Sequence, residues 1–112
     1  MGLILCYKNR GISKDITIQD VNGIAITPGV HDKLRITIGR EGQTAELTFT
    51  SDSPTADGSS ITKGATNRLR LDAADLDFDP GVYCLTVDYY DNADAQEWKI
   101  VEKQTFVLES EN

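Results

Sequence analysis

The segment Lys33-Leu34-Arg35-Ile36-Thr37-Ile38 alternates polar and apolar side chains without a break. Successive side chains of a β-strand point to opposite faces, so this period of two predicts a strand that buries Leu34, Ile36 and Ile38 together. A helix would instead space its apolar residues three and four positions apart. The fold is therefore expected to be built from half-buried strands.

The same period recurs through most of the chain. A hairpin is expected before this segment, with strands at 16–18 and 24–26 joined by a turn at Asn22-Gly23. Further strands are expected at 47–49, 68–71, 82–90, 97–101 and 104–108. The polar stretch 51–66 is expected to be a long loop, and Asp72 to cap a single helical turn.

Several short strands with almost no helix predict one all-β domain, folded as an antiparallel sandwich. The length of 112 residues suits a single domain. Phe78 is expected to close one end of the core. The expected core comprises the inward residues of the strands: Ile16, Ile18, Leu34, Ile36, Leu47, Leu69, Leu71, Tyr83, Leu85, Val87 and Phe106.

The chain is acidic, with a formal net charge of −7. A surface of this sign repels phosphate backbones, which argues against a nucleic-acid partner. No segment approaches the ~18 consecutive apolar residues of a membrane span. The apolar run Leu3-Ile4-Leu5 is too short for a signal peptide. Synthesis in a cytoplasm is expected.

Catalytic and metal-binding side chains are sparse. His31 is the only histidine, and Ser59-Ser60 lie in the polar loop without a positioned base. Cys6 and Cys84 are expected to be reduced and not bonded to each other. The sequence therefore predicts no enzyme and no cofactor.

Oxygen-bearing side chains crowd the turn after the strand 82–90. Asp88, Asp91, Asn92 and Asp94 could together hold Ca²⁺, but their spacing does not fit an EF-hand loop. An acidic, solvated turn is the preferred interpretation.

The segment 79–84, Asp-Pro-Gly-Val-Tyr-Cys, resembles the tyrosine corner of immunoglobulin-like domains. In that motif the disulfide cysteine lies two residues after the tyrosine, where Leu85 stands here. Trp98 is expected to be a large core residue. The alternative is a ligand-stacking platform of Trp98, Tyr89 and Tyr90, although the adjacent tyrosines should point oppositely.

The first dozen residues form a separate segment in this interpretation. Leu3, Ile4, Leu5 and Tyr7 make an apolar head, which a polar break follows. The head is either the first edge strand or an arm that docks on a neighbouring subunit by strand addition. The expected organisation is thus 1–12 as arm or strand, 13–109 as the sandwich and 110–112 as a frayed tail.

A resemblance to a known group rests on the second half of the chain. It consists of Arg68-Leu69-Arg70-Leu71, Ala73-Ala74-Asp75, Pro80-Gly81-Val82-Tyr83 and Phe106-Val107-Leu108. This pattern is similar to small phage and prophage proteins with an immunoglobulin-like sandwich. The likeness extends over 15–108, and the group's pattern offers no catalytic residues to carry over. It implies membership of a virion.

The first functional hypothesis is a non-enzymatic capsid decoration, or cement, protein. It would bind the major capsid protein as a homotrimer and contact its neighbours through the N-terminal head. A chain holding one sandwich and an acidic surface favours this placement on the outside of a shell. The alternatives are a tail or baseplate component of the same fold and a carbohydrate-binding module.

Overall fold

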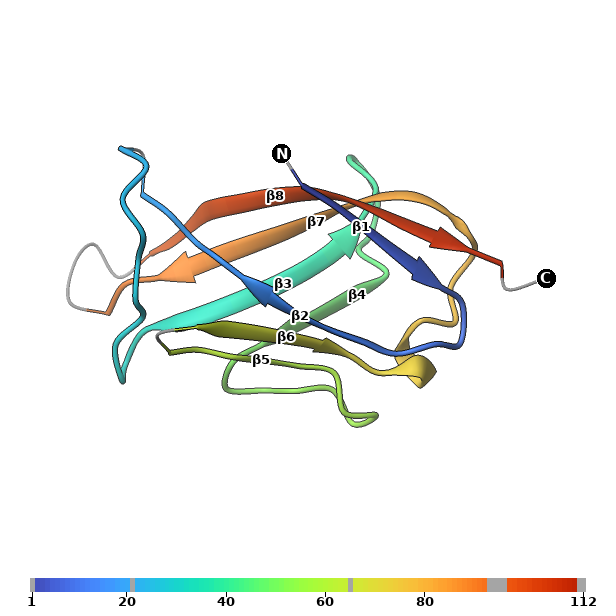
Figure 1. Cartoon of the computed structure of the whole chain (residues 1–112), viewed down its shortest axis with the longest axis horizontal. Helices are drawn as coiled ribbons and strands as arrows, with labels where there is room; N and C mark the ends of the chain where they lie inside the picture. Colours follow the sequence, from blue (N-terminus) through green and yellow to red (C-terminus); the bar gives the residue numbers. More distant parts are fainter. Residues whose placement is uncertain (1, 21, 65, 93–96, 111–112) are drawn as a thin grey trace.

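The computed structural model describes residues 2–20, 22–64, 66–92 and 97–110. These residues form two β-sheets packed face to face (Figure 1). The larger sheet contains, in spatial order, β1 (Gly2–Tyr7), β8 (Trp98–Glu109), β7 (Gly81–Tyr90), β3 (Lys33–Gly39) and β4 (Leu47–Thr50). The smaller sheet contains β2 (Ile12–Ile16), β6 (Asn67–Leu71) and β5 (Ser60–Thr62). The prediction of an all-β protein with two sheets is confirmed.

Strand β7 pairs antiparallel with β3 and with β8, and β6 pairs antiparallel with β2 and β5. Between the described strands the one parallel pairing joins β1 to β8. The expectation of a wholly antiparallel sandwich is therefore wrong at this edge. The chain crosses from the larger sheet to the smaller between β1 and β2, so β1 does not pair with its neighbour in sequence.

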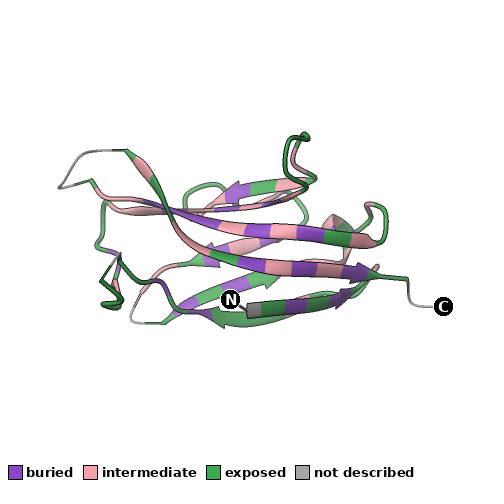
Figure 2. Ribbon diagram, turned by 90° about the horizontal axis from the view of Figure 1, so that it is seen from above, coloured by how far each residue is buried: buried purple, intermediate pink, exposed green. Residues whose placement is uncertain are grey.

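The core lies between the sheets, where buried residues alternate along the strands with less buried ones (Figure 2). Every residue of the expected core is buried except Leu47, which is half-buried at the margin. Leu34, Ile36 and Ile38 are all fully enclosed. Burying each such side chain stabilises the fold by about 1.5–3 kcal/mol relative to exposure. The alternation in 33–38 therefore anchors the larger sheet.

The expected hairpin at 16–26 is not formed as a pair of strands. Residues 24–26 are linked to 18–19 by a single bridge, Gln19 to Ala25, and by the N–H of Ile26 donating to Ile18 at 2.9 Å. The carboxylate of Asp20 accepts from the N–H groups of Asn22 and Ile24. Such local side-chain bonds compete with a ladder, and the segment curls around Asp20.

Two other expectations also differ from the structure. The strands expected at 97–101 and 104–108 form one strand, β8, whose register shifts by a bulge opposite Val87 and Asp88. The loop expected at 51–66 contains β5. A bulge shifts the alternation of inward and outward side chains within one continuous strand. In the sequence, such a shift looks like the end of one strand and the start of another.

The expected helical turn is present as a short 3₁₀ helix, η1 (Ala73–Asp75), and Asp72 caps it by accepting from the N–H of Ala74 at 3.1 Å. The carboxylate of Asp75 accepts from the hydroxyls of Thr55 and Ser59, both at 2.5 Å. Ser59 is completely buried. This cluster fastens the loop before β5 to the end of β6.

Replacing Asp75 with alanine should lower the free energy of unfolding by about 1–3 kcal/mol, because it leaves the buried hydroxyl of Ser59 without its acceptor. Urea denaturation measures this change. The exposed Asp77→Ala is the matched control and should shift the free energy by less than about 0.5 kcal/mol. Equal effects of the two substitutions would contradict the proposed role of Asp75.

Candidate protein-contact surface

Strand β1 divides the N-terminal head between the two faces of the larger sheet. Ile4 and Cys6 point into the core and are 2% and 1% exposed. Leu3, Leu5 and Tyr7 point outward and are 60%, 47% and 43% exposed. Alternation along a strand produces this division directly.

The N-terminal head forms the first edge strand of the larger sheet, which is one of the two alternatives expected for it. Residues 2–7 pair with β8 throughout, from Gly2 opposite Gln104 to Tyr7 opposite Glu109. Ile4 was expected among the contact residues, but it is a core residue and cannot reach a partner. The outward residues of β1 remain available on the surface.

The outward residues of β1 continue into an apolar surface on the neighbouring strands. Leu5 lies opposite Val107 on β8, and Val107 lies opposite Val82 on β7. Val82 is 63% exposed. We call this surface the outer apolar patch; it comprises Leu3, Leu5, Tyr7, Val82 and Val107.

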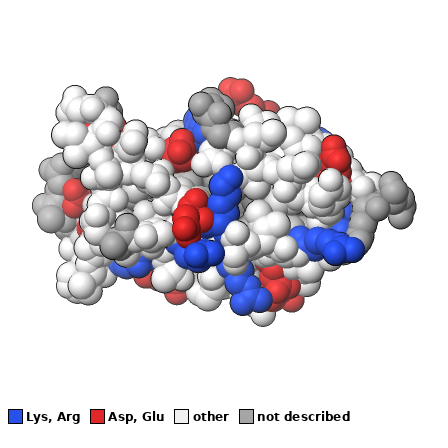
Figure 3. All heavy atoms as spheres, in the orientation of Figure 1, with Lys and Arg blue, Asp and Glu red and all other residues white. Residues whose placement is uncertain are grey.

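One charged side chain, that of Glu109, borders the outer apolar patch beside Tyr7. In Figure 3 uncharged atoms cover most of the region over β1, and Lys, Arg, Asp and Glu gather toward the middle, over β2 and β6. There Arg68 pairs with Asp15 at 2.8 Å. Sequence reasoning missed Val82 and Val107 as contact candidates, because their place in one row with Leu5 depends on strand register. The sequence did indicate that Val82 faces outward, because it is adjacent in the same strand to Tyr83, which was expected to face the core.

Of the four residues considered for Ca²⁺, the structure describes Asp88, Asp91 and Asn92. Asp88 faces outward on β7 and accepts from Nε and Nη2 of Arg35 at 2.9 and 2.7 Å. The backbone N–H of Asn92 donates to Asp32 at 3.0 Å. Asp94 lies outside the described residues. Within the described ranges no three His, Cys, Asp or Glu side chains gather as metal ligands.

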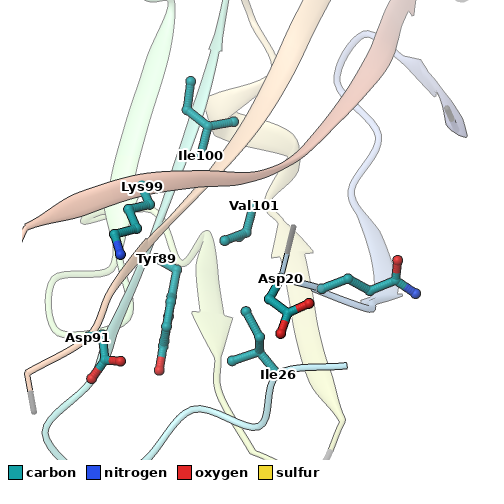
Figure 4. A pocket seen from close by; sticks show the side chains of 8 residues that line it. Asp20, Ile26, Tyr89, Asp91, Lys99, Ile100 and Val101 are labelled. Carbon is teal, nitrogen blue, oxygen red and sulfur yellow. The ribbon is translucent and has the colours of Figure 1, made fainter. Parts of the chain in front are cut away.

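A groove of about 530 Å³ lies between the 19–26 loop and the bulged end of β8 (Figure 4). Its lining is mixed: Gln19, Asp20, Ile26, Tyr89, Asp91, Lys99, Ile100 and Val101. The hydroxyl of Tyr89 donates to Asp32 at 2.8 Å. Burial, followed by this bond to the carboxylate, raises the pKa of Tyr89 well above its usual value. The phenol is thus held neutral as a structural donor.

Asp32 is the centre of a clamp at this end of the sandwich. Besides Tyr89, its carboxylate accepts from the N–H groups of Gly29 and Asn92 at 2.7 and 3.0 Å. Nζ of Lys63 donates to the backbone oxygen of Asp32. Burial alone would raise the pKa of Asp32, but these donors outweigh it and hold the pKa below its usual value.

The aromatic residues considered for ligand stacking are divided between the faces. Tyr89 is buried, whereas Tyr90 and Trp98 share the outer face with ring centroids 5.4 Å apart. The expectation that Trp98 belongs to the core is wrong, because its register partner Tyr90 points outward. The guanidinium of Arg35 lies 4.4 Å from the Trp98 centroid, and Nζ of Lys33 lies 5.7 Å from that of Tyr90. Each ring therefore has a cation over one face.

The cysteines lie on opposite faces of the larger sheet, and both are free thiols. Burial raises the pKa of the Cys6 thiol to about 11, against a smaller lowering by Lys14. Cys84 points outward, as its phase relative to Tyr83 predicts. The thiolate is the reactive form, so Cys6 is chemically quiet at neutral pH.

Comparison with protein-family models and with curated proteins finds no match for this chain. No helix among the described residues is long and apolar enough to cross a membrane. The candidate site therefore rests on the geometry of the outer apolar patch.

The substitution Ile4→Ala should lower the free energy of unfolding by about 2–5 kcal/mol, because it opens a cavity in the core. Leu3→Ala, one position away and outward-facing, should change it by less than about 0.5 kcal/mol. Urea denaturation of both variants tests whether β1 is part of the fold. Two equally small effects would mean that the head is an arm rather than a strand.

Asp32→Asn should destabilise the protein at neutral pH by an amount that shrinks in acid. The pKa of Asp32 is lower in the folded than in the unfolded protein, so its contribution is present above its ordinary pKa of 3.8 and is lost as the pH falls through the folded pKa. Urea denaturation between about pH 7 and pH 2 measures the difference. Asp57→Asn, at an exposed position, is the control for the loss of one carboxylate. A constant difference for Asp32→Asn would exclude the clamp.

Proposed function

We propose that this chain is a non-enzymatic structural protein of a bacteriophage particle and acts by protein–protein contact. The observation that carries the proposal is the outer apolar patch. Contiguous exposed apolar residues on a small domain mark surfaces that contact another macromolecule. In this protein Leu5, Val107 and Val82 follow one register row across three strands of a single sheet, and Leu3 and Tyr7 lie on either side of Leu5 along β1.

An immunoglobulin-like topology is part of the same proposal. The order β1-β8-β7-β3-β4 facing β2-β6-β5, with the first strand parallel to the last, supports it. The corner motif supports it too, because the hydroxyl of Tyr83 donates to the backbone oxygen of Asp79 at 2.5 Å. A tyrosine bonded to backbone a few residues upstream is the tyrosine corner of these domains.

The particle assignment draws on the resemblance to small phage and prophage proteins. Its motifs fall on Leu69 and Leu71 in the core, on η1 and on the Tyr83 corner. These residues determine the fold and support the assignment to this class of protein. The outer apolar patch separately supports a role in protein–protein contact. Capsid decoration through the major capsid protein is the preferred placement, since an acidic exterior suits the outside of a DNA-filled shell. A tail or baseplate position is the alternative.

Immunogold labelling of particles from the source phage or prophage, with antibody against the purified protein, tests the placement. Label over the heads supports decoration, and label confined to tails supports the alternative. Particles without label would overturn the virion proposal.

Rebinding to stripped shells tests the surface. Val82→Lys should reduce occupancy at least about tenfold, because a charge in a desolvated contact costs more than 1.4 kcal/mol. Thr48→Lys on β4, also exposed, is the control and should bind as the unmodified protein does. Equal binding of both variants would show that the patch is not the contact.

A further inference from the structure

The open edge of β1 presents backbone groups as well as side chains. The N–H of Lys8 donates to Glu109 on β8 at 2.8 Å. Successive N–H and C=O groups alternate in direction along a strand, so those of Leu3, Leu5 and Tyr7 point away from β8. The C=O of Tyr7 also accepts from Arg10 at 3.0 Å. Leu3, Leu5 and Tyr7 thus carry the backbone groups of the open edge, and the C=O of Tyr7 already has one donor there.

The other edge strands of the described sheets are protected, whereas β1 is not. Strand β4 has four residues and β5 has three. Strand β2 carries Lys14 and Asp15. Strand β1 has six residues, with no charge, no proline and no bulge in its pairing. Short length and charge are the features by which proteins prevent edge-to-edge pairing, so β1 is built as an edge that accepts a strand.

We infer that β1 pairs antiparallel with β1 of a second copy, about a two-fold axis at Leu5. In this register Leu5 lies opposite Leu5 of the second copy, and Leu3 lies opposite Tyr7 of the second copy. The outward N–H and C=O groups of these residues then face one another as hydrogen-bonded pairs. The two larger sheets become one continuous sheet.

The side-chain register is self-complementary. The row Val82, Val107, Leu5 of one copy meets Leu5, Val107, Val82 of the other, which makes one unbroken aliphatic row across six strands. A two-fold interface requires this kind of self-complementary surface. A shift by one residue would turn the backbone groups and the side chains out of phase.

Charge favours a second copy at this edge. Two chains of net charge −7 repel each other over most of their surfaces. Residues 2–7 of β1 carry no charged side chain, and the neighbours of Leu3, Leu5 and Tyr7 on β8 are Thr105, Val107 and Glu109. In the two-fold register each Glu109 shares its row with Thr105 of the second copy and not with the other Glu109. The β1 edge is thus a place where two copies approach without opposing like charges.

This inference rests on the proposed function only in taking the patch as a contact surface, and it revises the expected trimer to a dimer. The dimer and the shell contact can be tested separately, because Leu5 lies on the two-fold axis whereas Val82 lies on the third strand from it. The dimer forms from purified protein alone, and shell binding requires particles.

Sedimentation velocity of the full chain from about 1 to 500 µM tests self-association, since a six-residue strand is small beside the roughly 800 Å² per partner of a standard interface. The expected result is a monomer–dimer equilibrium in this range. A monomer throughout, or a trimer, would overturn the inference.

Leu5→Lys should weaken the dimer at least about tenfold, because it sets two ammonium groups opposite each other at the axis. Thr48→Lys adds the same charge to β4 and should leave the dimer unchanged. Val82→Lys should also dimerise, even where it no longer binds shells. Dimerisation of Leu5→Lys as strong as that of the unmodified chain would exclude this edge.

Disulfide trapping tests the register. Directly opposed residues have Cα atoms about 5.5 Å apart, within the roughly 4.4–6.8 Å that a disulfide spans. Leu5→Cys in a Cys84→Ser background should therefore yield a covalent dimer on mild oxidation, and Thr48→Cys in the same background should not. Circular dichroism checks that both variants are folded. Failure of folded Leu5→Cys to crosslink at concentrations where the dimer forms would exclude the two-fold register.

Discussion

The pairing of β7 with β3 on one side and with β8 on the other fixes the rest of the larger sheet. Leu85 and Val87 can be buried only if their neighbours in register, Ile36, Ile38 and Gln104, turn the same way. Once these rows are set, β8 offers its remaining edge to β1, and Ile4 completes the inner face. The outward phase of Val82 and Val107 follows from the same rows. The register of these strands therefore determines both the buried core and the outward-facing contact surface.

Much of this arrangement could be predicted from single strands. The alternation in 33–38, the cap at Asp72 and the outward phase of Cys84 each depend on neighbours in sequence, and each agrees with the structure. Long-range choices could not be predicted in this way. Trp98 lies on the outer face because of its register with Tyr90, and the local bonds of Asp20 prevent a second strand at 24–26.

The candidate site shows the same division. The sequence gives the alternation of Leu3 and Leu5 with Ile4, but not the strand beside which they lie. A parallel pairing between the first and last strands leaves no turn signature, because the rest of the chain separates them. Only the pairing places Leu5 and Val82 on either side of Val107. Sequence patterns therefore identify which residues can form a surface, and the topology decides which of them meet.

The parallel alignment of β1 and β8 also has a mechanical consequence. Because the two strands run in the same direction, tension that pulls the start of β1 away from the end of β8 slides them along each other. Such shear loads the hydrogen bonds of 2–7 together, whereas an antiparallel hairpin pulled at its open end separates bond by bond. Resistance to force is governed by the rate of unfolding. Strand β1 is therefore oriented to bear load along its length through its pairing with β8.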